Sequence, residues 1–118
     1  MAASDSLPVV KGTVDLIVLK ALSWGPMHGF GISSWLETQT GGSLVMDDGA
    51  LYQVLHRLEA REFVEPEWGV TENNRKARYY KLTAAGRRYL RDETAQWLRS
   101  SSTVTTLLTL NTRSATGA

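Results

Sequence analysis

The fold is decided by one stretch, residues 48–83, which reads DGALYQVLHRLEAREFVEPEWGVTENNRKARYYKLT. The apolar residues of its first part recur at a spacing of three and four, which predicts a helix over residues 48–62 with one buried face. Those residues are Leu51, Val54, Leu55 and Leu58. The remainder predicts a strand (63–68), a polar turn (69–76) and a second strand (77–82), so a helix is followed directly by a hairpin.

Polar and basic side chains occupy the parts of this unit that the core leaves free. His56 and Arg57 fall off the apolar face of the helix, and the hairpin turn contributes Asn74. From Asn73 to Arg91 there is no acidic residue, and seven of the 13 Lys and Arg of the chain occur there: Arg75, Lys76, Arg78, Lys81, Arg87, Arg88 and Arg91. A helix that fits the major groove, followed by a basic hairpin, is typical of DNA recognition. The alternative is a solvated basic face.

Composition excludes several other classes of protein. The chain has 118 residues, 42% of them hydrophobic, and a net charge of +1, which predicts one globular domain. It has no cysteine, hence no disulfide framework, and its longest apolar run (16–19) cannot span a bilayer. No signal peptide is recognisable, so a cytoplasmic location is expected. With only His28 and His56, no metal-binding spacing and no phosphate loop, we expect no enzyme, metal or cofactor.

The segments before this unit predict two further helices. Residues 1–10 are small and polar and are interpreted as a flexible arm. A first helix is expected from about residue 13 to 24, ending at Gly25–Pro26. A second begins at His28 and is expected to turn Phe30, Ile32, Trp35 and Leu36 inward. Residues 44–46 are a candidate short strand. Trp24, Trp35 and Trp68 are interpreted most simply as core or sheet-edge residues.

A last helix is expected over residues 84–110, capped by Thr83 and followed by a disordered tail (111–118). Residues along it recur every seven positions, the pattern of two helices packed side by side. They are Leu90, Thr94, Trp97, Ser101, Val104 and Leu108. The chain has too little core to cover such a stripe, so a second copy is the expected partner. The whole is predicted to be mainly α with a small β-hairpin: a winged helix-turn-helix (11–83) with a C-terminal dimerisation helix.

Four strings in this order make residues 11–100 resemble the PadR family of bacterial transcriptional regulators, in its short form with a single C-terminal helix. The family's opening helix resembles residues 12–22, and its turn into the second helix resembles GPMHGFGI (25–32). Its recognition helix resembles GALYQVLHRLE (49–59), and its wing resembles RKARYYKLTAAG (75–86). Departures occur at Gly31, usually acidic, at Ala50, usually Thr or Ser, and at Gln53, usually Pro. They put the operator sequence in doubt.

The resemblance implies a homodimer that binds palindromic promoter DNA, usually to repress. The residues implied to contact DNA are Tyr52, Gln53, His56 and Arg57 on the recognition helix, and Asn74, Arg75, Lys76 and Arg78 on the wing. Tyr52 is equally well interpreted as a core residue under the wing, and Gln53 offers an amide that could read adenine. Some relatives sense planar aromatic compounds at the dimer interface. Trp97 is the matching candidate here, against the simpler interpretation that it packs with the residues that line the interface, Leu90, Val104 and Leu108. A winged-helix module that has lost DNA binding and contacts proteins is the alternative function.

Overall fold

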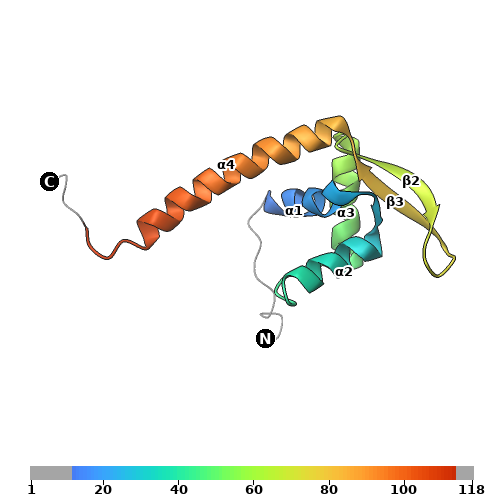
Figure 1. Ribbon diagram of the computed structural model, residues 1–118, viewed down its shortest axis with the longest axis horizontal. Helices are drawn as coiled ribbons and strands as arrows, with labels where there is room; N and C mark the ends of the chain where they lie inside the picture. The colour runs from blue at the N-terminus through green and yellow to red at the C-terminus, as the bar shows by residue number, and fades with distance from the viewer. Residues whose placement is uncertain (1–11, 114–118) are drawn as a thin grey trace.

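The computed structural model describes residues 12–113, which form helices, a small sheet and one long final helix (Figure 1). In chain order the elements are α1 (Thr13–Ala21), the 3-10 turn η2 (Leu22–Trp24), β1 (Met27–His28), α2 (Gly29–Gln39), α3 (Asp48–Ala60), β2 (Val64–Val70), β3 (Lys76–Leu82) and α4 (Ala84–Leu108). The expected arm (1–10) and most of the expected tail lie outside the described residues. This order of helices and hairpin is the predicted winged helix-turn-helix, which is confirmed.

The sheet has three antiparallel strands in the order β1–β3–β2. The predicted hairpin is present, with Val64 opposite Leu82 at its base and Val70 opposite Lys76 at its tip. The third strand, β1, pairs Met27 with Tyr80. The short strand expected at residues 44–46 is wrong, because that segment is irregular and the extra strand lies before α2 instead. Two residues paired across more than fifty positions leave no local pattern to predict them from.

Side-chain caps fix where α3 and α4 begin. The carboxylate of Asp47 accepts a hydrogen bond from the Ala50 N–H at 2.8 Å, which starts α3. The hydroxyl of Thr83 accepts from the Gly86 N–H at 3.0 Å and donates to the Glu62 carbonyl at 2.7 Å. Thr83 thus starts α4, as predicted, and also ties it to the end of α3.

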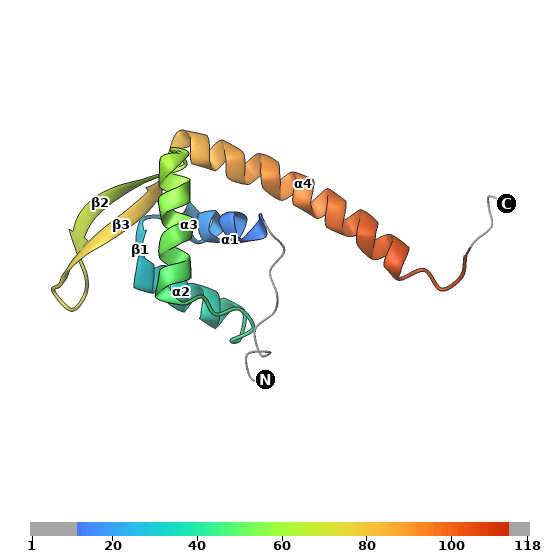
Figure 2. The ribbon, with the colours of Figure 1, turned by 180° about the vertical axis from the view of Figure 1, so that it is seen from behind.

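A single apolar core lies between α1, α2, α3 and the inner face of the sheet. All four predicted apolar residues of α3 are buried in it, and each contributes about 1.5–3 kcal/mol relative to exposure. The core residues are Val18, Leu19, Ala21, Leu22, Ile32, Leu36, Leu51, Val54, Leu55, Leu58, Val64, Tyr80 and Leu82. This core holds α3 so that its opposite side faces solvent (Figure 2).

The last helix joins this body only through its first turns. Gly86 is buried against the backbone of Phe63, and the ring of Tyr89 stacks on the Phe63 ring at 4.4 Å between centroids. Beyond these turns α4 runs away from the body, on the side opposite to the hairpin (Figure 1). Within the described residues, no helix is both long and apolar enough to cross a membrane.

Candidate nucleic-acid interface

The solvent-facing side of α3 presents Gln53 and His56. Both side chains are exposed, on the side of the helix away from Leu55 and Leu58. Ala50, which lacks the hydroxyl expected at that position, is also exposed, and only its backbone N–H is engaged, by the Asp47 cap. A row of polar side chains on an otherwise unobstructed helix can enter a major groove and meet base edges there.

Tyr52 lies half-exposed at the edge of this row. Its ring contacts the His56 ring at 4.1 Å between centroids, with the planes tilted by 53°. The interpretation of Tyr52 as a core residue is wrong, because 51% of its surface is exposed, and the interpretation as a DNA contact stays a prediction. One side of Tyr52 borders the wing and the other remains accessible.

Ion pairs hold both flanks of α3. On one flank, Arg57 donates from Nη2 and Nε to the two carboxylate oxygens of Asp15, on α1. This hydrogen bond and the carboxylate charge raise the pKa of Arg57. On the other flank, Glu59 accepts from Arg78, on β3, at 3.2 Å. Two of the arginines expected to contact DNA are therefore already paired within the chain.

The turn of the wing presents its basic residues without such partners. The Thr71 hydroxyl accepts from the backbone N–H groups of Asn73 and Arg75, at 3.3 and 3.2 Å, and so shapes the turn. Asn74 has a φ of 60°, which an asparagine tolerates better than most residues. Arg75 and Lys76 follow it, both exposed, and in the described part of the chain neither makes an ion pair with a carboxylate.

The basic stretch that the sequence shows from Asn73 to Arg91 is partly neutralised in space. Lys81 lies 3.5 Å from Glu67 and 3.9 Å from Glu65, both on the neighbouring strand. Arg91 pairs with Asp92 at 3.1 Å. Because these carboxylates come from segments outside or beside the stretch, the sequence pattern overstated its charge. The free positive charge of the wing is concentrated at its tip.

Phe30, which lies exposed on this surface, was predicted from the sequence to be a core residue. Phe30 was expected to face inward, but 75% of its surface is exposed, so that prediction is wrong. The His28 ring caps α2 by accepting from the Gly31 N–H at 3.0 Å, which places Phe30 in the first turn, ahead of the buried Ile32 and Leu36. A shallow cleft of about 280 Å³ begins beside it. Its lining residues are Gly29, Phe30, Asp48, Leu51, Tyr52, Leu55, Arg78 and Tyr80.

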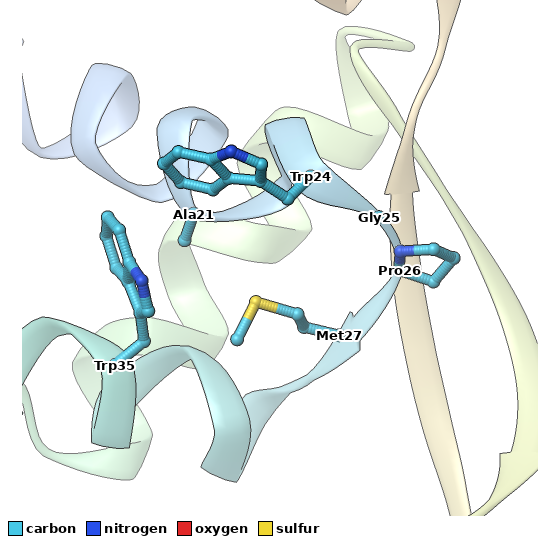
Figure 3. A pocket seen from close by; sticks show the side chains of 6 residues that line it. All are labelled: Ala21, Trp24, Gly25, Pro26, Met27 and Trp35. Atoms are coloured by element: carbon cyan, nitrogen blue, oxygen red, sulfur yellow. The ribbon is translucent and has the colours of Figure 1, made fainter.

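A second hollow, of about 300 Å³, shares no residue with that cleft (Figure 3). Its walls are two tryptophans, Trp24 and Trp35, whose ring centroids lie 5.6 Å apart, with Met27 beneath them. Trp24 is 69% exposed, so its expected place in the core or at a sheet edge is wrong. The ammonium of Lys20 lies over its outer ring face at 4.7 Å. Trp68 lies on β2, an edge strand of the sheet, so its expected place at a sheet edge is confirmed; the side chain is exposed, with the ammonium of Lys76 over its ring.

The residues predicted to line a dimer interface fall into two groups. Leu90 packs partly against the core of its own chain. Trp97 is 45% exposed, and Val104 and Leu108 are more exposed still. Because these three side chains are exposed, the described part of the chain does not cover the apolar face of this part of α4.

Comparisons with known proteins agree with this geometry. The sequence profile described as the transcriptional regulator PadR-like family matches residues 18–92. An uncharacterised protein of Lysinibacillus sphaericus is 30% identical over 97 residues, which are 82% of this chain and 86% of that protein. The crystal structure of a PadR-family transcriptional regulator from Eggerthella lenta is 29% identical, with a TM-score of 0.73 and 86% of each chain covered. Bacillus subtilis PadR in complex with operator DNA has a TM-score of 0.62 at 21% identity, over 70% of this chain and 46% of that one.

Proposed function

Because the chain belongs to the PadR-like family of transcriptional regulators, we propose that it is a cytoplasmic, sequence-specific DNA-binding repressor. It acts as a homodimer on a palindromic operator. The protein is a regulator and not an enzyme, which agrees with the absence of catalytic patterns in the sequence. In each subunit α3 enters a major groove and the wing holds the flanking backbone.

The observation that carries this proposal is the pairing of an unobstructed α3 with a basic wing tip. Gln53 and His56 face solvent between two anchored flanks, and Arg75 and Lys76 are exposed at the turn of the wing. Gln53 can donate to and accept from adenine, and the two wing cations can neutralise phosphates. Tyr52 and Asn74 complete the proposed contacts. Arg57 and Arg78 border the same surface.

Dimerisation is proposed through α4. Three apolar residues of the seven-residue repeat, Trp97, Val104 and Leu108, are exposed, so a second copy can cover them. A dimer must place its two α3 helices about 34 Å apart to match successive major grooves. A planar aromatic effector stacked on Trp97 would change that separation. Equal affinity of the native chain and Trp97→Ala for planar aromatic compounds would refute this part of the proposal.

The test is fluorescence anisotropy of a labelled duplex carrying the gene's own upstream region, titrated at several salt concentrations. If each subunit neutralises about three phosphates, log affinity falls against log salt with a slope of about −5. Arg75→Ala with Lys76→Ala is expected to flatten the slope. Arg88→Ala with Arg99→Ala, which removes the same charge from α4, is the matched control and is expected to leave it unchanged.

The alternative function, a module that binds proteins, is favoured by one observation. Arg57 and Arg78 are both neutralised by carboxylates of the same chain, which reduces the charge available to DNA. The same titration separates the two functions. Saturable, salt-dependent binding that survives competitor DNA and is lost in the wing variant supports the repressor. The absence of salt-dependent binding to any duplex supports the module.

A further inference from the structure

The ion pair between Asp15 and Arg57 is unlike the others in the protein. Among the described residues, Asp15 is the one charged side chain that the core buries. It lies on α1, 42 positions from Arg57, and both its carboxylate oxygens accept from the guanidinium. The remaining pairs join side chains that are each at least partly open to solvent.

Burial on one side makes this pair difficult to open. If Arg57 turned away toward a phosphate, the carboxylate of Asp15 would lose the cation that pairs with it. Its side chain is only 11% exposed, so little water could replace that cation. That cost is set by the protein and does not depend on the DNA sequence. Arg57 is therefore held at α1, although about half of its side chain remains exposed.

The pair also has no net charge. Attraction to the DNA backbone depends on the cations that a protein brings to the phosphates, and an arginine neutralised by an adjacent carboxylate adds little. Arg57 lies on the flank of α3 that faces α1, beside the exposed Gln53 and His56. A free arginine there would attract every phosphate equally, whatever the base sequence.

From this geometry we infer that Asp15 is a specificity-determining positioning residue: it withholds Arg57 from the phosphate backbone and so suppresses non-specific DNA binding. The inference rests on the proposed DNA-binding function. Asp15, on α1, thus contributes to the discrimination between operator and non-specific DNA without itself contacting DNA. Arg57 is then not one of the residues that contact the phosphate backbone. Asp15 thereby holds one flank of α3 in place, and the affinity for DNA depends mainly on the contacts of Gln53 and His56 with bases.

The decisive variant is Asp15→Asn, which keeps the shape of the side chain and frees the charge of Arg57. Binding to a random-sequence duplex is expected to strengthen several-fold at low salt, and the slope of log affinity against log salt is expected to steepen by about one per subunit. The preference for a duplex selected by the native chain over a random one is expected to fall. A purely structural role for Asp15 would lower stability and leave the salt slope alone.

Two further variants complete the test. Asp92→Asn frees Arg91 on α4 in the same way and is expected to leave slope and preference unchanged. Asp15→Asn with Arg57→Gln replaces the ion pair by a neutral pair and should restore the native slope. If Asp15→Asn does not fold, this double variant decides the question alone, because a slope flatter by about one per subunit would show that Arg57 reaches phosphate in the native protein.

The outcomes are distinguishable from failure of the proposed function. If the native chain shows no salt-dependent binding to any duplex, DNA binding itself fails, and the inference with it. If the native chain binds but folded Asp15→Asn has the native slope and preference, only the inference is overturned. A steeper slope with reduced preference supports it.

Discussion

The body formed by residues 12–83 and the outer half of α4 differ in how their apolar side chains are covered. In the body, three helices and a sheet bury one another's apolar faces, so the core is complete within one chain. In the outer half of α4 the apolar side chains of Trp97, Val104 and Leu108 share one side of the helix, yet they remain exposed. The apolar side chains of the body are therefore covered within the chain, whereas those of the outer half of α4 are not covered by the described part of the chain.

This difference separates two kinds of stability. Side chains buried in the body contribute the same free energy at every protein concentration. Side chains on the outer part of α4 contribute only when a partner is bound, so their effect depends on concentration. Substitutions in the two regions should therefore differ in kind as well as in size.

The largest effect is expected for Leu58→Ala, at the centre of the core. Removing a fully buried leucine side chain should lower the free energy of unfolding by about 2–5 kcal/mol. Urea denaturation at two protein concentrations measures it, and the loss should be equal at both. Leu108→Ala makes the same change at an exposed site and should cost less than about 0.5 kcal/mol in the monomer. If both substitutions lowered the free energy of unfolding equally, the proposed difference between the body and the outer half of α4 would be refuted.

The junction between the regions is expected to be nearly as sensitive. In Gly86→Ala the new Cβ would overlap the carbonyl oxygen of Phe63, a backbone atom that cannot move away freely. We expect a loss of about 3 kcal/mol, measured by thermal or urea unfolding. Gly49→Ala, also in the first turn of a helix but in ordinary contact with its neighbours, is the control and should be close to neutral. An unaffected Gly86→Ala would mean that α4 is not anchored at this point.

A charge on the outer helix should separate the copies without unfolding the body. Val104→Glu places a carboxylate on the apolar face and is expected to weaken dimerisation at least tenfold, or about 1.4 kcal/mol. Sedimentation velocity measures the association, and circular dichroism checks that the helices persist. Thr106→Glu, on the opposite side of α4, should leave association intact. If both variants associate normally, the apolar face serves some other contact.

The smallest effect is expected at the cap that joins α3 to α4. Thr83→Ala removes a hydroxyl that both caps α4 and donates to Glu62, at an expected cost of about 1 kcal/mol. Thr83→Ser keeps the hydroxyl and should recover most of the loss. If Ser behaves like Ala, the contribution of Thr83 comes from its methyl group and not from the two hydrogen bonds.

Local patterns predicted much of this fold. The apolar spacing of α3, the hairpin and the Thr83 cap are all properties of neighbouring residues, and each was predicted from the sequence. The strand β1 was missed, because its two residues are defined only by a partner far along the chain. Phe30 was misplaced because the start of α2 depends on the His28 cap, whose position a periodic pattern does not reveal.

The candidate interface was predictable only in part, for a related reason. The exposed row on α3 and the wing tip follow from local sequence. Arg57 is neutralised by Asp15 on α1, and Arg78, on β3, is neutralised by Glu59 on α3. Counting charges along the chain could not find these partners, because each lies far away in the sequence. Whether an arginine is free or paired is a property of the folded chain.

The edge strand β2 has features that prevent strands of other chains from pairing with it. β2 is paired on one side only, which leaves a row of backbone groups on which another chain could add a strand. Pro66, in the middle of β2, has no N–H to offer to such a strand, and the carboxylates of Glu65 and Glu67 flank it. When copies gather at high local concentration, as two subunits on one DNA site would, the sheet is protected from growing between them. In the proposed dimer, contact between copies is thereby left to the apolar face of α4.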